Sequence, residues 1–351
     1  MNSNVMRLKK TIAIAILAMT ASAELMGQNI DGDKTVKYIP EVHGTIRGKY
    51  EYQIQEGEGR FEVRNARISF TGKVLPEVNY KAEIDLSDEG NIKMLDAYTR
   101  LTPVKRLNFT IGQFRVPFTI DAHRSPHQQY FANRSFIAKQ VGNVRDVGAS
   151  LSYSCKGNLP VILDVGLFNG SGLTNQKNYW TKKVNFSAKA QVFLPKGFNV
   201  TLSTQKISPS GNSVMMYDAG TYWHSKGWHI EAEYLFKHYS NGTFGDVHSF
   251  DSFINYDITV RNKKSMVRKV SPLVRYDMMT DHSDGISKDD NGQLTVTDYK
   301  RHRITSGVTI SLATPFVSDI RINFEKYLYR EGAIPKPSEK DKFVVEFMTR
   351  F

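Results

Sequence analysis

The 351-residue sequence predicts an all-β fold, a transmembrane antiparallel up-and-down β-barrel of about 16 strands. Three features predict this fold. Apolar residues recur at alternate positions through most of the chain, as in strands with one dry and one wet face. The last such run, 343–351, ends on Phe351, and outer-membrane barrels place an aromatic residue of the final strand at the membrane interface. Short and long connections also alternate between the predicted strands.

The N-terminus has the pattern of a secretory signal peptide. Basic residues precede the apolar stretch 11–20, and Ala21-Ser22-Ala23 is a small-residue cleavage site. The apolar stretch is too short to span a bilayer, so we expect cleavage after Ala23, with a second cut after Gly27 as an alternative. The sequence thus divides into a signal peptide (1–23), a periplasmic N-terminal segment (24–37) and the transmembrane β-barrel (38–351).

The strands are predicted from alternating runs that end at Gly, Pro, Asn or Asp. In one of them, Trp228, Ile230 and Tyr234 would face one way while His229 and Glu231 face the other. The predicted ranges are 38–53, 61–74, 78–86, 92–101, 107–117, 146–155, 160–168, 184–194, 198–207, 214–224, 228–239, 247–260, 268–280, 300–313, 318–330 and 342–351.

Composition limits the alternatives. The mean hydropathy is −0.40, and no long apolar run follows the signal peptide, which excludes transmembrane helices and leaves a closed barrel as the way to cross a bilayer. Cys155 is the only cysteine, so no intramolecular disulfide can form. The net charge of +12 becomes 12 − 3 = +9 without the three basic residues of the signal peptide. In an exported β-protein this charge favours anionic solutes and lipopolysaccharide phosphates as partners, and no nucleic acid is expected.

The connections predict which rim faces outward. Every second connection is short and turn-like, at 75–77, 156–158, 195–197, 225–227 and 314–316. The connections between them include the long polar segments 169–183, 281–299 and 331–341. Transmembrane barrels have short turns on the periplasmic rim and long loops outside. The 261–267 connection is long for a periplasmic turn.

The longest gap in the strand pattern, 118–145, is the third predicted external loop. It combines apolar side chains, such as Phe131 and Phe136, with several cations. The apolar residues would pack against the barrel wall while the cations face the channel, so we expect this loop to fold into the lumen and narrow it. The candidate constriction and solute-binding residues are Arg115, Arg124, Arg134, Lys139 and Arg145.

The same region resembles a known family. Gly112-Gln113-Phe114-Arg115-Val116-Pro117-Phe118 is similar to the Gly-Gln-Phe-(Lys/Arg)-x-Pro-Phe signature of the phosphate-selective porin O and P family. Segments 133–136 and 145–148 resemble that family's Glu-Arg-Ser and Arg-x-(hydrophobic)-Gly segments, with Asn133 in place of the glutamate, so a salt bridge made there is absent or rebuilt. The resemblance implies a sixteen-stranded, trimeric porin constricted by the third loop, without implying phosphate selectivity for every member.

Cations also recur on the strand faces opposite the apolar ones. The predicted lumen-wall cations are Arg47, Arg67, Lys73, Lys81, Arg275, Arg301, Arg303 and Arg321. Arginine suits phosphate because its planar fork binds two oxygens, and rings of cations select anions in pores. The same faces carry acids such as Glu51, Asp96 and Glu325, which leaves a transverse field or simple wall ion pairs open.

The sequence therefore predicts an outer-membrane porin of a Gram-negative bacterium. It would be a passive diffusion channel for small hydrophilic solutes that prefers anions, with phosphate as the narrower hypothesis. The alternative is a non-conducting adhesive or structural barrel that binds through its external loops. No enzyme is expected because no nucleophile motif appears. His123 and His127 lack the helix that would bring them together on a metal, so neither a metal nor a cofactor is expected.

Overall fold

The computed structural model describes residues 39–142, 144–173, 176–262, 264–312 and 317–351. The predicted signal peptide, the periplasmic segment 24–37 and the predicted turn at 314–316 lie outside the described residues. None of the helices in the described ranges is long and apolar enough to span a membrane.

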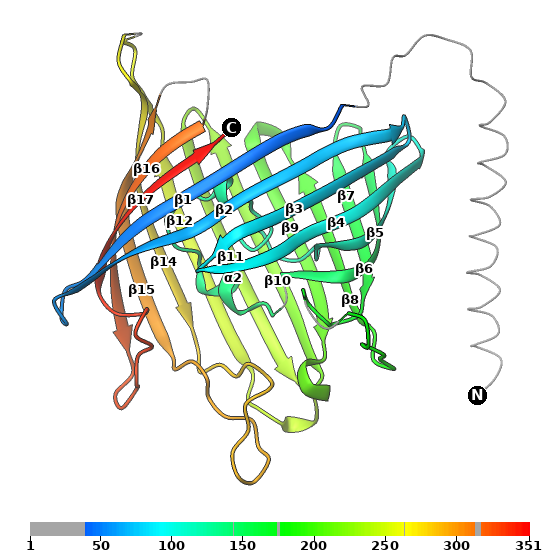
Figure 1. Ribbon diagram of the computed structural model, residues 1–351. Coiled ribbons are helices and arrows are strands. Elements are labelled where there is room, and N and C mark those ends of the chain that lie inside the picture. The colour runs from blue at the N-terminus through cyan, green and yellow to red at the C-terminus, as the bar shows by residue number, and fades with distance from the viewer. Residues whose placement is uncertain (1–38, 143, 174–175, 263, 313–316) are drawn as a thin grey trace, which may run out of the picture.

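The described strands form one closed antiparallel sheet (Figure 1). Each strand pairs with the next along the chain, and β1 pairs with β17 to close the ring. β13 has two residues and pairs with β14, the same neighbour as β12. It therefore counts with β12 as one strand, and the barrel has 16 strands, which confirms the predicted fold. The strands are β1 (Glu41–Gln53), β2 (Glu58–Leu75), β3 (Val78–Asp88), β4 (Asn91–Val104), β5 (Leu107–Arg115), β6 (Arg145–Cys155), β7 (Val161–Phe168), β8 (Asn185–Phe193), β9 (Phe198–Ile207), β10 (Val214–Ser225), β11 (Trp228–Tyr239), β12 (Val247–Tyr256), β13 (Ile258–Thr259), β14 (Val267–Met279), β15 (Arg301–Leu312), β16 (Val317–Tyr329) and β17 (Lys342–Arg350).

Helical turns occur only in connections within these described ranges. The longest, α2 (Phe136–Gln140), lies between β5 and β6 together with η1 (Pro126–Gln128). The others are η2 (Pro195–Gly197), η3 (Pro209–Gly211) and η4 (Ser240–Gly242).

The alternation of side chains separates two faces, as β11 shows. Trp228, Ile230 and Tyr234 are exposed on the outer face, while His229 and Glu231 are buried on the inner face. This is the distribution expected of a barrel with lipid outside and a polar interior. The predicted faces of this strand are confirmed.

The two rims differ in the length of their connections (Figure 1). One rim carries tight turns such as 76–77 and 226–227, together with the start of β1 and the end of β17. The other rim carries the long connections 169–184, 280–300 and 330–341. The one long connection described on the first rim is 257–266, the region noted as long from the sequence.

Several predicted strand boundaries are wrong, among them the starts at 38 and 61, which lie at Glu41 and Glu58. Two of the differences have a specific cause. The predicted strand 107–117 ends at Arg115, because the chain then turns inward and Pro117 has no N–H for the ladder. The predicted strand 247–260 breaks at Asp257. The N–H of that residue bonds Gly227 O (2.8 Å) instead of β14, and its carboxylate bonds Lys269 Nζ (2.9 Å).

Phe351 pairs with Gly44 where β17 meets β1 and closes the barrel. Gly44 N donates to Phe351 O (2.8 Å), and Phe351 N donates to Gly44 O (3.1 Å). A Cβ built on Gly44 would overlap the Phe351 ring. The phenyl ring of Phe351 therefore lies directly on the β1 backbone at the seam of the barrel, the junction of β1 and β17.

Replacing Gly44 by valine is expected to destabilise the closed barrel by about 1–3 kcal/mol, because the Phe351 ring must leave its place on the seam. Denaturant unfolding of the refolded barrel measures this change. Gly48→Val is the matched control on the same strand, since a Cβ there has no atom within 4 Å. Equal losses in the two variants would contradict the proposed role of the seam.

Candidate functional site

Segment 116–144, which joins β5 to β6, is the centre of the candidate site. Its start is fixed by the signature glycine and glutamine. Gly112 has φ +130°, and a Cβ there would lie 2.8 Å from Tyr98 Cα, so only glycine fits. Gln113 Nε2 donates to Met94 O (2.7 Å) and Leu95 O (2.8 Å), two carbonyls at the irregularity where β4 leaves its register with β3.

The chain then turns away from the sheet towards β8. Val116 N still bonds Val144 O (3.0 Å), which holds the two ends of the segment together. Beyond it, Ser187 Oγ donates to Pro117 O and Lys189 Nζ donates to Thr119 O, each at 2.5 Å. The buried Lys189 of β8 thus holds a backbone carbonyl of the segment.

Two arginines organise the turn that follows. Arg115 Nη1 donates to Ala122 O (2.7 Å) and to Arg124 O (2.9 Å). Arg134 Nη2 donates to the same Arg124 O (2.6 Å), and its Nη1 bonds Asp121 O. The Arg115 and Arg134 guanidinium groups therefore share one acceptor oxygen and lie side by side.

Helix α2 anchors the far end of the segment. Its N-cap residue Ser135 accepts from Ala138 N and donates through Oγ to Asp121 Oδ2 (2.8 Å). Phe136 N donates to Asp277 Oδ2 of β14 (3.1 Å). Phe136 and Ile137 are fully buried in an apolar cluster with wall residues that include Met216, Leu235, Val247 and Met279. Packing of the loop's apolar residues against the wall is thus observed.

Between the turn and α2, side chains of distant strands hold the segment's backbone. Arg47 of β1 donates to Ala132 O (2.7 Å), and Ala132 N donates to Asn323 Oδ1 of β16 (2.9 Å). Arg275 of β14 donates to Asn133 O (3.0 Å), and Arg303 of β15 donates to Arg134 O (2.7 Å). The partners belong to one arc of the closed sheet, in which β14, β15, β16, β17 and β1 are consecutive neighbours.

Asn133, which stands where the Glu-Arg-Ser segment of the resembled family has glutamate, is held by hydrogen bonds that a glutamate could not make. Its amide Nδ2 donates to Glu51 Oε1 (3.2 Å) and to Glu325 Oε1 (3.0 Å), and its Oδ1 accepts from Lys49 Nζ (3.3 Å). A neutral donor between two carboxylates links β1 to β16. A third carboxylate at this position would instead repel the other two.

Replacing Asn133 by aspartate is therefore expected to loosen the segment, because a carboxylate would then face Glu51 and Glu325 with no hydrogen bond between them. Trypsin would cleave after Arg124 and Arg134 about tenfold faster in the folded barrel. Asn108→Asp is the control, since that lumen amide bonds only the hydroxyl of Thr102 among the described residues. Unchanged cleavage in Asn133→Asp would contradict the assigned role.

The five predicted constriction residues do not all lie together. Arg115, Arg124 and Arg134 meet around the turn at 121–124. Arg145 is the cross-strand neighbour of Arg115, and its charge is offset by Asp96 Oδ1 (2.6 Å). Lys139 lies apart in α2, 3.3 Å from Glu339 of the connection between β16 and β17.

The charge of Arg124 is also largely neutralised. Both of its terminal nitrogens contact the Glu231 carboxylate, one of them at 2.8 Å from Oε1. Arg115 differs, because no carboxylate of the described residues lies within 4 Å of its guanidinium, and its hydrogen-bond acceptors there are carbonyl oxygens.

Most of the predicted lumen-wall cations are paired with acids on neighbouring strands, which favours wall ion pairs among the alternatives left open. Arg275 is farther from its acids, at 3.8 Å from both Asp251 and Asp277. Lys73 is exposed near the short-turn rim, and no ion pair of the described residues involves it. The close pairs are Arg47–Glu346 (2.5 Å), Arg321–Glu346 (2.6 Å), Arg303–Asp277 (2.6 Å), Arg67–Asp85 (2.8 Å), Lys81–Asp96 (2.7 Å) and Arg301–Glu339 (2.8 Å).

The pKa values of groups in segment 116–144 reflect the local excess of cations. Burial alone would raise the pKa of Asp121, but Arg134 and Arg124 outweigh it and lower the pKa. Burial, assisted by Arg350, lowers the pKa of His127 to about 4. At neutral pH, Asp121 is therefore ionised and offsets part of the arginine charge, while His127 is neutral and adds none.

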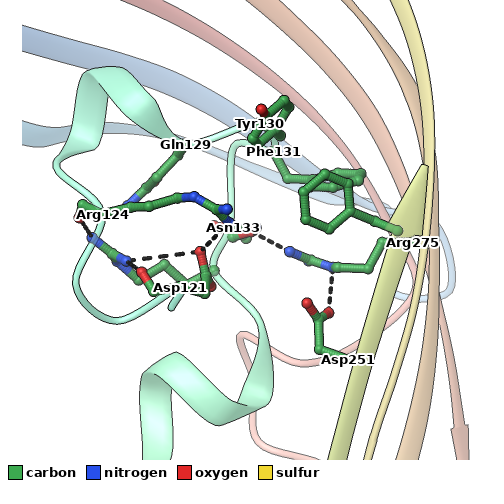
Figure 2. A pocket seen from close by; sticks show the side chains of 10 residues that line it. Asp121, Arg124, Gln129, Tyr130, Phe131, Asn133, Asp251 and Arg275 are labelled. Carbon is green, nitrogen blue, oxygen red and sulfur yellow. Dashed lines mark hydrogen bonds and ion pairs between the residues drawn. The ribbon is translucent and has the colours of Figure 1, made fainter. Parts of the chain in front are cut away.

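A small pocket lies where this segment meets the wall (Figure 2). It is lined by Tyr130 and Phe131 of the segment and by Phe253, Arg275 and Asp251 of β12 and β14. Arg275 Nε and Nη2 and Asp251 Oδ1 are buried there without a hydrogen-bond partner in the described structure. The sequence did not indicate this pocket, because its aromatic lining comes from two segments more than a hundred residues apart.

Comparison with solved structures shows the same architecture at low sequence identity. An anion-selective porin from Comamonas acidovorans superposes with a TM-score of 0.61 and 12% identity, over 89% of this chain and 98% of that one. The outer membrane channel DcaP of Acinetobacter baumannii gives 0.60 and 14%, over 89% and 96%. OmpT of Vibrio cholerae, in its trimer form, gives 0.58 and 11%, over 89% and 98%. At these identities the likeness concerns the fold.

No curated protein matches the sequence. The family profile described as "Phosphate-selective porin O and P" matches residues 41–222, which is just over half of the chain and includes β1 to β9 and segment 116–144. The match agrees with the signature at 112–118 and with the 16-stranded ring. This chain therefore belongs to the phosphate-selective porin O and P family and is a porin of the Gram-negative outer membrane.

Proposed function

We propose that this porin is a passive diffusion channel that favours small anions and is narrowed by segment 116–144. Its family and fold are those of a channel rather than an enzyme. One observation carries the anion preference: Arg115 and Arg134 donate to the same carbonyl oxygen, Arg124 O, at 2.9 and 2.6 Å.

Two guanidinium groups on one oxygen repel each other, and a neutral carbonyl cannot cancel two charges. The acid close to Arg134 is Asp121, at 4.0 Å, and it is shared with Arg124 at 3.7 Å. A passing anion relieves this repulsion, whereas a passing cation adds to it. Paired cations elsewhere on the wall contribute less, because their acids offset them.

Phosphate is the narrower hypothesis for the favoured solute. A phosphate dianion matches two adjacent guanidinium forks better than a monovalent anion does, since each fork can bind two oxygens. The Comamonas porin is described as anion-selective, which agrees with the broader proposal.

Assembly and targeting complete the proposal. We infer that residues 1–23 direct export and are removed, that residues 24–37 remain in the periplasm, and that the barrel works as a homotrimer in contact with lipopolysaccharide. The trimer form of the structurally similar OmpT supports this assembly. The exposed apolar residues on the outer face of the strands suit contact with lipid.

The test is the zero-current potential of the refolded protein in a planar bilayer under a salt gradient, repeated with added phosphate. We expect a potential of the sign that anion permeation produces, and a conductance that millimolar phosphate reduces. A potential near zero would reject the anion preference. Conductance that phosphate reduces no more than chloride or sulfate does would reject the phosphate hypothesis alone.

The non-conducting barrel is the alternative function, and one observation favours it. The apolar cluster of α2 fills the space beside β10 to β14, and buried ion pairs occupy the wall nearby. A refolded, correctly folded protein that gives no current would support this alternative and reject the channel.

A further inference from the structure

Five aromatic rings form a continuous contact series on the inner face of β10 to β12. We call His224, Tyr222, His229, Tyr130 and Phe253 the aromatic track. His229 is its centre, with ring centroids 5.8 Å from His224, 5.4 Å from Tyr222, 4.7 Å from Tyr130 and 5.4 Å from Phe253. Three of these four pairs are stacked, with interplanar angles of 23–27°.

The aromatic track runs from the short-turn rim to the candidate constriction. His224 lies beside the turn at 226–227, directly across the ladder from His229. Tyr130 belongs to segment 116–144, and Arg124 lies over its ring at 5.3 Å. A solute that has passed the arginines on its way to the periplasm would meet these rings next.

Part of the aromatic track faces open space. His224 is exposed, Tyr222 and Tyr130 are half-buried, and His229 and Phe253 are buried behind them. No hydrogen bond of the described residues involves the hydroxyl of Tyr130 or Tyr222. The Tyr130 ring is already covered by His229 and Arg124, so a ring from a solute would stack on the exposed parts of His224 and Tyr222.

The polar groups around the aromatic track favour a flat aromatic ring over a sugar. Sugar binding needs several free donors and acceptors beside the stacking ring. Here the Glu231 carboxylate is held by Arg124 and accepts from His229 Nε2 at 3.0 Å, so it is already paired. The track leaves a solute the exposed parts of its rings and the hydroxyls of Tyr130 and Tyr222, which are fewer polar groups than a sugar needs.

Two arginines lie at the end of the aromatic track: Arg124, which is paired with Glu231, and Arg275, which is farther from its acids. Arg124 lies 5.7 Å above the Phe253 ring, and Arg275 lies 4.4 Å above Phe131 in the adjoining pocket. The buried Arg275 also has Nε and Nη2 without an acceptor among the described residues. A ring bound on the track would thus have these arginines near one end and the exposed His224 near the other. Figure 2 shows the end at Tyr130, with Arg124 and Arg275 beside it.

We propose that the aromatic track is a binding site for small aromatic carboxylates that cross this porin. The inference rests on the proposed function, because the anionic group is selected by the arginines before the ring reaches the track. It adds a solute class, since a charge-selective constriction alone does not distinguish flat rings from other anions of equal size.

The experiment compares two anions that differ in the flatness of the ring. Benzoate and cyclohexanecarboxylate are added in turn to the periplasmic side of single channels, and the dwell time of each block is measured. Benzoate is expected to dwell about fivefold longer, as one aromatic stacking contact provides. Tyr222→Leu should remove most of this difference, while Tyr222→Phe, which keeps the ring, should retain it.

Tyr98→Leu is the matched control, because Tyr98 is a half-buried lumen tyrosine of β4 outside the aromatic track. Equal dwell times for the two anions, or an equal loss in Tyr98→Leu and Tyr222→Leu, would overturn the aromatic site while leaving the anion channel intact. If the unmodified protein gives no current, the proposed function fails. The track is then tested by equilibrium binding of benzoate to the refolded barrel, and binding equal to that of cyclohexanecarboxylate would overturn it.

Discussion

Replacing Asp277 by alanine is expected to release α2 from the wall. The single-channel conductance and the current noise should both increase. Asp277 accepts from Arg303 Nε (3.0 Å) and Nη2 (2.6 Å), and from Phe136 N (3.1 Å) at the start of α2. Both carboxylate and guanidinium are fully buried. Removing one partner of such a pair costs about 3–5 kcal/mol, because the other charge stays buried and unpaired.

The remaining contact of Arg303 with Glu325, at 3.5 Å, places the expected loss near the lower end of that range. Denaturant unfolding measures the loss, and single-channel recording measures the noise. Asp277→Asn separates the two roles of the residue, since it keeps an acceptor for Phe136 N but removes the charge. We expect it to retain the quiet current better than alanine does.

Asp164→Ala is the control for this prediction, because Asp164 is a half-buried acid of β7 that forms no ion pair within the described residues. A stable Asp277→Ala barrel with an unchanged current would show that α2 is held by its apolar contacts alone.

The strands could be predicted closely because their causes are local. A period of two with one apolar face specifies a strand wherever it occurs, and β9 and β11 have the predicted bounds. The break at Asp257 was not predictable, since it depends on Gly227 O, which is 30 residues away in the turn before the neighbouring strand β11.

The location of cations on the inner wall could also be predicted, but not their charge balance. Alternation places Arg47 and Glu346 on inner faces, yet only the closure of β1 on β17 brings them into contact. Arg115 and Arg145 look equivalent in the sequence. Of these two arginines, only Arg145 has its charge offset by Asp96. The reason is the placement of β4 and β6 on either side of β5.

The path of segment 116–144 follows from contacts that no local pattern encodes. Asn133 bonds Glu51 and Glu325, which are 82 and 192 residues away. The five-residue α2 is too short for a helical period to appear, and its apolar residues have a partner surface only once β10 to β14 are assembled. The aromatic track was missed for the same reason, because it joins three strands and segment 116–144.

Replacing Arg115 by glutamine is expected to remove most of the anion preference while leaving a conducting channel. The charge of Arg115 is offset by carbonyl oxygens alone within the described structure, so its full field acts on a passing ion. At close range in a partly screened site, one unit charge changes the barrier by about 1 kcal/mol or more, which corresponds to about a fivefold change in the anion-to-cation permeability ratio. The zero-current potential under a salt gradient gives this ratio directly.

Two further variants decide whether the effect comes from charge at this position. Arg115→Lys keeps the charge and should keep most of the preference, although it loses the fork that holds both Ala122 O and Arg124 O. Arg100→Gln removes a lumen charge from β4, where the guanidinium bonds only Thr110 among the described hydrogen bonds. If Arg100→Gln lowers the preference as much as Arg115→Gln does, selectivity arises from the net charge of the lumen. If only Arg115→Gln lowers it, selectivity arises where Arg115 and Arg134 meet, because among the described residues only there do two guanidinium groups compete for one neutral oxygen.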